Sequence, residues 1–199
     1  MVSAKIGDDE VEMLQGIEDA SEHLLRMINN LLQLSKLESN SMTIEKEKID
    51  VVSIVEEMIE LVAPLIDEKE LLLEKSLEKE DISVVTDVNL FKQVVINLLS
   101  NAIKYTHEGS ITITLKRESK AFVLEVIDTG IGIAKSKQEE LFSEFYQAHN
   151  KNSGIKYSTG LGLALSQKVA HLIHGEIKIF SEGEGRGVRA TFRFNSFLS

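Results

Sequence analysis

The sequence predicts an α+β protein, a two-layer sandwich of one mixed sheet covered by helices and preceded by a long helix. Three observations lead to this prediction. An apolar stripe with helical spacing runs through residues 8–38. The stretches 110–128 and 176–194 each hold two β-rich runs around a polar or Gly-rich turn, as hairpins do. The segments between these features have the apolar spacing of amphipathic helices.

Composition excludes several classes of protein. The chain has 199 residues, enough for one domain of ordinary size and a smaller element. Its formal net charge of −10 argues against a nucleic-acid-binding surface. The sequence holds neither a long apolar run nor a signal-peptide pattern, so we predict no membrane segment in this chain. It has no cysteine, which fits a reducing cytoplasm; whether a longer parent protein is membrane-anchored stays open.

Residues 8–38 are expected to form one helix that seeks partner helices. Its apolar stripe consists of Leu14, Ile17, Ser21, Leu24, Ile28 and Leu31, widened by Leu25 and Leu32. A single helix cannot bury such a stripe. Because most of the remaining sequence looks committed to another fold, we expect the partner in another chain or in sequence outside this one. We therefore divide the chain into a helical part, 1–40, and a second domain, 41–199.

From residue 42 the sequence changes to the pattern of a mixed domain. A short strand is expected over 42–50, followed by an amphipathic helix over 51–70 in which Pro64 causes a kink or an early stop. The elements expected next are strands at 71–77 and 82–87 and a helix at 88–106. Residues 134–159 are polar and read as a long loop, which in a compact domain is usually functional or disordered. A helix introduced by glycines follows over 160–175.

The helix at 88–106 carries polar residues in an unusual place. Asn97 and Asn101 are four apart and share one face, and Lys104 flanks the same stripe next to Tyr105. Amide oxygens that lead to an ammonium group suit a metal bound to a phosphate. The alternative from these residues alone is a solvated helix face, and it is equally compatible with them.

Two glycine-containing segments add to this pattern. In 122–133, Asp128 ends a row of apolar residues on one strand face, and Gly130 and Gly132 follow at once. Such a carboxylate suits the amine of a flat apolar ligand such as adenine, although Asp-Thr-Gly is also a common turn. In 158–166, glycines precede an apolar helix whose free N–H groups suit a phosphate, although the helix could simply begin with glycine.

The order of these segments resembles the catalytic and ATP-binding domain of sensor histidine kinases, within the group that includes gyrase, Hsp90 and MutL ATPases. The sequence "NLLSNAIKYT" is similar to the N box and "DTGIGI" to the first glycine box. The sequence "LFSEFYQ" is similar to the F box and "GLGLAL" to the second glycine box. The sequence "INNLLQLSKLES" resembles the second helix of the dimerisation and phosphotransfer hairpin. The fold implied is the two-layer α/β sandwich of this ATP-binding group.

The resemblance implies a set of roles around Mg-ATP. Asn101, with Asn97 beside it, would supply oxygen to Mg²⁺, and Lys104 would face the phosphates. The residues implied at the nucleotide are Tyr105, Asp128, Gly130, Gly132, Tyr146, Gln147, Gly160, Leu161, Gly162 and Leu163. Asp128 would accept the adenine amine, and 134–159 would be the ATP lid, held by Phe142 and Phe145. The family usually has a Ser or Thr after the last glycines. In this chain that position falls on Val188 in one alignment and on Thr191 in another, so no adenine contact is assigned there.

The implied reaction is transfer of the γ-phosphoryl group to a histidine, for relay to the receiver domain of a response regulator. The helix would make a homodimer. ATPases of the group typically have Glu where this chain has Asn97, which cannot take a proton from water. None of His23, His107, His149, His171 and His174 has the sequence context of the acceptor, which we expect outside this chain. The alternatives are an ATPase of the same fold and a non-catalytic nucleotide-sensing or dimerisation module.

Overall fold

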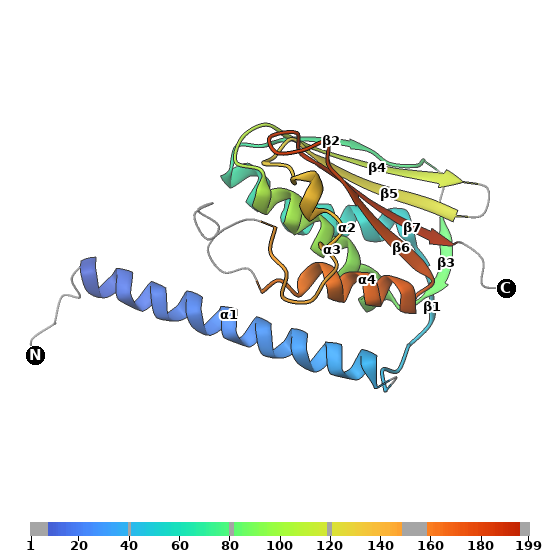
Figure 1. Ribbon diagram of the computed structural model, residues 1–199. Coiled ribbons are helices and arrows are strands. Elements are labelled where there is room, and N and C mark those ends of the chain that lie inside the picture. The colour runs from blue at the N-terminus through green and yellow to red at the C-terminus, as the bar shows by residue number, and fades with distance from the viewer. Residues whose placement is uncertain (1–7, 40, 80–81, 119–120, 149–158, 196–199) are drawn as a thin grey trace, which may run out of the picture.

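The computed structural model describes residues 8–39, 41–79, 82–118, 121–148 and 159–195. Its centre is a five-stranded sheet in the order β2-β4-β5-β7-β6, with helices covering one face (Figure 1). The strands are β2 (Leu72–Ser76), β4 (Ser110–Glu118), β5 (Ala121–Asp128), β6 (Gly175–Phe180) and β7 (Val188–Asn195). The covering helices are α2 (Val51–Glu68), α3 (Val88–Tyr105) and α4 (Gly162–Leu172). The predicted two-layer α+β sandwich is confirmed.

The core lies between the sheet and these helices. Phe91 of α3 meets Phe122, Phe192 and Phe194 of the sheet, with ring centroids 5.6–6.2 Å from that of Phe91. All four rings are fully buried. Residues on β5 alternate between buried and half-buried, as expected for a sheet with one covered face. The alternation leaves Asp128 on the covered side, at the end of the apolar row.

Two aspartates fix where the central helices begin. The Asp50 carboxylate accepts from the backbone N–H groups of Val52 and Ser53, both at 3.2 Å, and so caps α2. Asp87 accepts from Asn89 N at 3.0 Å and Leu90 N at 3.1 Å and caps α3. These caps satisfy amide donors that a helix leaves without an intrahelical partner. Asp50 is the last residue of β1 (Glu47–Asp50), and Asp87 directly follows β3 (Ser83–Thr86); the two strands form a separate antiparallel pair.

Helix α2 passes through Pro64 and ends at Glu68, so of the two expected effects of the proline, a kink or an early stop, the early stop is wrong. Proline removes one N–H donor from the helix, which leaves the carbonyl group of Glu60, four residues earlier, without its usual bond. Both residues lie on the exposed face of α2, where that carbonyl group can bond to water. The buried residues of α2, from Val51 to Ile66, continue on both sides of the proline and hold the helix to the core.

The sheet joins segments that are distant in sequence. Strand β2 pairs parallel with β4, and β7 lies between β5 and β6 with both pairings antiparallel. The register places Val188 opposite Asp128, and Thr191 opposite Glu125. The start of β7 therefore lies beside the carboxylate end of β5.

Helix α1 (Asp8–Glu38) extends beyond the sandwich at its N-terminal end (Figure 1). Its stripe is exposed over most of its length, from 42% to 59% at Leu14, Ile17, Leu24, Ile28 and Leu31. The C-terminal end differs, because Leu34 is buried and Leu37 packs against the core. The apolar residues of the stripe thus lie exposed, whereas the helix packs within the chain through Leu34 and Leu37, which are not part of the stripe. The side-chain amides of Gln33 and Gln93 also join α1 to α3, at 2.6 and 2.9 Å.

Candidate functional site

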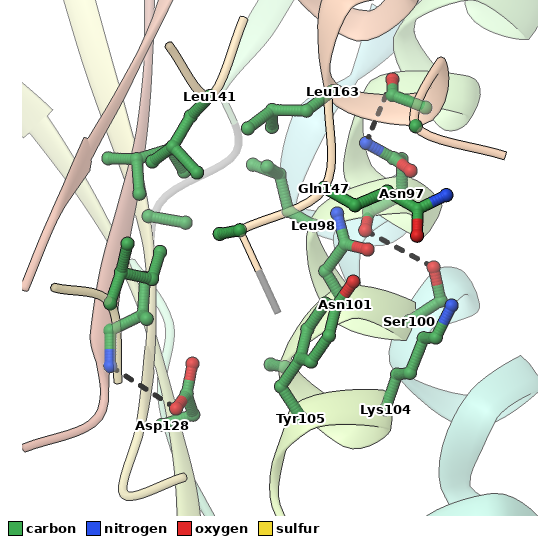
Figure 2. Close-up of a pocket in the computed structure, with 18 of the residues that line it drawn as sticks. Asn97, Leu98, Ser100, Asn101, Lys104, Tyr105, Asp128, Leu141, Gln147 and Leu163 are labelled. Atoms are coloured by element: carbon green, nitrogen blue, oxygen red, sulfur yellow. Dashed lines mark hydrogen bonds between the residues drawn. The ribbon is translucent and has the colours of Figure 1, made fainter. Parts of the chain in front are cut away.

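A pocket of about 320 Å³ lies between α3 and the carboxyl end of β5. Figure 2 shows Asn97, Asn101, Lys104 and Tyr105 along the α3 wall and Asp128 on the opposite wall. The apolar residues between these walls are Leu98, Ala102, Val126, Ile133, Leu141, Leu163, Ile179, Val188 and Ala190. The pocket is thus an apolar slot with a carboxylate on one wall and polar groups on the other.

The α3 wall is built by helical spacing. Asn97 and Asn101 are one turn apart, and Lys104 and Tyr105 occupy the last turn of the helix. The ammonium group of Lys69 donates to Ile103 O at 2.6 Å and to Thr106 O at 3.2 Å. This contact satisfies carbonyl groups that the end of α3 leaves without intrahelical donors. It holds in place the turn that carries Lys104 and Tyr105.

Lys104 faces the pocket in a partly buried position. Burial lowers its pKa, and the positive charge of Arg26 lowers it further. Both causes disfavour the charged ammonium form. An anion placed in the pocket would counter both effects by stabilising that form.

Asp128 is buried at the other wall, with 7% of its surface exposed. Its Oδ1 accepts from Gly130 N at 2.9 Å and from Val188 N at 3.2 Å. Burial raises the pKa of Asp128, and these two bonds oppose the rise because they stabilise the carboxylate. Among the described residues no hydrogen bond is made to Oδ2. One oxygen is thus fixed by the backbone while the other can accept a donor from a ligand.

The first two glycines shape this wall in different ways. Gly130 is not itself part of the pocket lining; its N–H holds Asp128, and a side chain there would strike the Tyr105 carbonyl group. Gly132 lines the pocket with φ +64°, a conformation that disfavours residues with a side chain. The backbone thus passes close to the end of α3 at one glycine and turns at the other.

The wall after Gly132 is held by a buried serine that sequence reasoning missed. Ser181 Oγ accepts from Ile133 N at 3.0 Å and donates to Gly187 O at 2.6 Å. The Gln138 side-chain amide donates to the carbonyl groups of Ile133 at 3.0 Å and Ser181 at 2.8 Å. These bonds join the pocket residue Ile133 to the Gly-rich turn before Val188. Ser181 gave no sequence signal, because serine in a hairpin turn is ordinary.

The second glycine pair lies at the start of α4. Gly160 has φ +69°, and a Cβ there would lie 2.6 Å from the carbonyl carbon of Phe145. Gly162 lies against the side chain of Asn97, which donates to Gly162 O at 3.3 Å. Gly160, Gly162 and Leu163 line the pocket. Leu161 is 2% exposed and belongs to the core, and it does not line the pocket, so its expected contact with the nucleotide stays a prediction.

The described part of the expected lid comprises 134–148 and Thr159. Tyr146 and Gln147 line the pocket as expected, together with Ala148. Phe142 packs against the core, as expected of a residue that holds the segment. The side chain of Phe145 is 56% exposed, so the expectation that it holds the segment by burial is wrong; its backbone, with φ +63°, meets Gly160 instead. Residues 149–158, including His149, lie outside the described residues.

The donor set fits Mg²⁺ better than a softer metal. No cluster of three or more His, Asp or Glu side chains able to hold a metal occurs in the described parts of the chain. Asn97 and Asn101 offer amide oxygens, and Mg²⁺ commonly takes one or two protein ligands and completes its shell with phosphates and water. The Asn97 amide nitrogen is engaged by Gly162, which leaves its oxygen as the free end. These residues therefore suit a magnesium ion that arrives with a phosphate.

Two lining residues come from outside the sandwich. Arg26 and Asn30 of α1 are part of the pocket, and no motif in the sequence indicated this. Their position depends on how the end of α1 packs against α3 and α4. Val188 also belongs to the lining, which places it rather than Thr191 beside Asp128. None of the four histidines in the described ranges lines the pocket.

This fold and site agree with the similarity of the chain to known proteins. A family model for the histidine kinase-, DNA gyrase B- and HSP90-like ATPases matches residues 86–196. The chain belongs to this ATPase family.

Within this family, the relatives of the chain are histidine kinases. Hybrid signal transduction histidine kinase B of Dictyostelium discoideum is 34% identical over 189 residues, which are 92% of this chain and 9% of the relative. The circadian input-output histidine kinase CikA of Synechococcus elongatus is 33% identical over 178 residues, which are 87% of this chain and 24% of the relative. The chain thus spans between 9% and 24% of these curated relatives.

A solved structure of a histidine kinase is also similar to this chain. The histidine kinase AdeS of Acinetobacter baumannii matches with a TM-score of 0.75 and 25% identity, over 98% of this chain and 87% of that one. The domain is therefore the catalytic ATP-binding domain of a sensor histidine kinase. Among the described helices, none is long and apolar enough to cross a membrane.

Proposed function

We propose that this chain binds Mg-ATP and donates its γ-phosphoryl group to a histidine outside the chain, for relay to the receiver domain of a response regulator. The supporting observation is the pocket itself. Asp128 lies across an apolar slot from a wall of amide oxygens and an ammonium group. A nucleotide has the same order of groups, with an amine on a flat base and an anionic chain at the far end.

The roles follow from these positions. Asp128 Oδ2 accepts the adenine amine while Oδ1 stays on Gly130 and Val188. Asn97 and Asn101 turn amide oxygens to Mg²⁺, and Lys104 faces the phosphates. When bound, Mg²⁺ supplies charge neutralisation on phosphate oxygens. Tyr105, Tyr146 and Gln147 border the nucleotide, while Gly160 and Gly162 let the backbone come close to the phosphates.

Asn97 favours a kinase over a hydrolysing ATPase. Phosphoryl transfer depends mainly on positioning and charge stabilisation, so the chain needs no base of its own. An amide at this position cannot take a proton from water at neutral pH. The site would therefore hold ATP intact until the acceptor imidazole arrives. If the chain is another kind of enzyme, the alternative is a hydrolysing ATPase of the same fold. If it catalyses no reaction, the alternative is a nucleotide-sensing or dimerisation module.

The exposed part of α1 supports a homodimer. Its apolar residues from Leu14 to Leu32 are solvent-exposed, whereas Leu34 is buried against the ATP-binding domain. A second copy of the helix, with the other half of the hairpin, would cover that stripe in a helical bundle. We accordingly assign 1–40 to dimerisation and phosphotransfer, 41–199 to ATP binding, and the domain to the cytoplasm.

Calorimetry and a transfer assay test the proposal. The chain is expected to bind ATP in the presence of Mg²⁺, to hydrolyse it very slowly, and to carry no acid-labile label after incubation with γ-labelled ATP. An added hairpin fragment with the upstream histidine is expected to become labelled. Rapid phosphate release without the fragment would favour the ATPase, and binding without transfer would favour the sensing module. Label mapped to His23 would show that the acceptor lies within this chain.

A further inference from the structure

Helix α1 contributes two polar side chains to the pocket. Arg26 and Asn30 are four residues apart, so they share one face of the helix, and both line the cavity. Their placement is set further along the helix, where Leu34 is buried and Gln33 bonds to Gln93. At the end of α1, Glu38 also pairs with Lys168 of α4 at 3.0 Å. The face with Arg26 is therefore directed to the pocket by several contacts of the same helix.

The charges at this end of the pocket are unusual for an acidic protein. Among the described residues, Arg26 and Lys104 are the cations that line the cavity, in a chain of net charge −10. The charge of Arg26 lowers the pKa of Lys104, after burial as the larger cause. Two cations that face one cavity repel each other unless an anion lies between them. A polyanion in the pocket would relieve this repulsion.

The ion pair that Arg26 makes in this structure is weak. Its guanidinium group pairs with Glu22 at 3.0 Å, one turn earlier on α1, with both side chains more than half exposed. Exposed pairs of this spacing contribute little to stability. Guanidinium binds phosphate with a bidentate geometry that forms stronger, charge-assisted bonds. Exchange of Glu22 for a phosphate is therefore favourable.

We propose that Arg26 binds the phosphate chain of the nucleotide, so that α1 completes a site whose other residues come from the sandwich. This inference rests on the proposed function and extends it to a residue of the dimerisation helix. Arg26 leaves Glu22 when the nucleotide binds and pairs with phosphate oxygen beside Lys104. The orientation of α1 then depends on whether a nucleotide is present.

The test compares Arg26→Ala with Lys36→Ala in the full chain. Lys36 is an exposed cation in the last turn of the same helix and does not line the pocket, so it controls for net charge. Binding of a non-hydrolysable ATP analogue with Mg²⁺, and of adenosine, is measured by calorimetry. Arg26→Ala is expected to weaken the analogue about five- to thirtyfold and adenosine less than about twofold. Lys36→Ala is expected to change both by less than about twofold.

The outcomes separate the inference from the proposed function. Equal affinity of the parent and Arg26→Ala for the analogue would overturn the role of Arg26 alone. Equal losses for the analogue and adenosine would also overturn it, because adenosine has no phosphate. A parent chain that binds neither compound would overturn the proposed function itself. Unchanged thermal unfolding without nucleotide is expected, since Arg26 is exposed, and shows that the variant is folded.

Discussion

The side-chain amide of Asn97 donates to the carbonyl oxygen of Gly162 at 3.3 Å, across 65 positions of sequence. This bond joins α3 to the first residue of α4, and both residues line the pocket. The bond engages the amide nitrogen of Asn97, so the amide oxygen is the atom that could bind a metal.

Asn97→Ala is expected to weaken Mg-ATP binding about five- to a hundredfold, because it removes a metal ligand and leaves Gly162 O without its donor. Calorimetry with and without EDTA measures the effect. Lys92→Ala is the matched control on α3, since Lys92 pairs with Glu57 and does not line the pocket. If the loss were the same with EDTA as with Mg²⁺, Asn97 would not be a metal ligand.

Asp128→Asn is expected to weaken ATP about five- to a hundredfold. The new amide can still accept from Gly130 N and Val188 N through its oxygen, but its nitrogen then presents a donor to the adenine amine, which is also a donor. Two facing donors cannot bond. Calorimetry with ATP measures the loss, and binding as tight as that of the parent would contradict the adenine assignment.

The same substitution is expected to change how stability depends on pH. Burial raises the pKa of Asp128 above its ordinary value of 3.8, so the folded state holds this proton more tightly than the unfolded chain. The stabilisation from this group is complete below pH 3.8 and is lost as pH rises through the folded pKa. Asp128→Asn does not titrate. Its melting temperature relative to the parent should therefore rise as the pH is raised from 3.8 through the folded pKa, without nucleotide; a constant difference would contradict the raised pKa.

Hydrogen exchange in residues 134–148 is expected to slow when a non-hydrolysable ATP analogue binds. Tyr146, Gln147 and Ala148 line the pocket, and Lys137 Nζ donates to Ala148 O at 2.6 Å, so a ligand there meets the segment directly. A peptide from β4 is the internal control, because that strand lies within the sheet. Equal exchange of 134–148 with and without the analogue would contradict a role for this segment in closing the site.

Two deletions test the role of α1. Removing residues 1–32 takes away the exposed stripe but keeps Gln33, Leu34 and Leu37, so a folded monomer with the thermal midpoint of the parent is expected. Removing 1–40 also removes the buried Leu34 and is expected to lower the midpoint by several degrees, since loss of a buried leucine costs about 2–5 kcal/mol. Sedimentation and thermal unfolding measure both. Self-association that survives the shorter deletion would place the dimer contact elsewhere.

The sequence was most informative where a local pattern decides the structure. The caps Asp50 and Asp87 and the apolar spacing of α3 follow from interactions within a few residues, and the predicted helices at those positions are confirmed. The choice between Val188 and Thr191 could not be made in this way. Both lie on one strand three residues apart, and only its register against β5, set by tertiary packing, puts Val188 beside Asp128.

Other site residues were hidden for related reasons. Arg26 and Asn30 belong to an ordinary amphipathic helix, and they reach the pocket only because the end of α1 docks on α3 and α4. Leu161 shows the reverse case. Its place between two glycines suggested a ligand contact, but its side chain is buried in the core. A motif indicates where the backbone approaches a ligand, but each side chain within it follows its own packing.

The interior position of β7 has a consequence for synthesis of the protein. The carboxylate of Asp128 takes a donor from Val188, 60 residues later, and β7 must also complete the sheet between β5 and β6. At about 5–20 residues per second, a ribosome needs roughly 3–13 s to go from Asp128 to the end of β7. During that interval the nascent chain exposes the edge of β5 and cannot build the pocket wall that holds Asp128. Nucleotide can therefore assist folding only after translation has passed the last strand, which makes the unfinished sheet a target for chaperones.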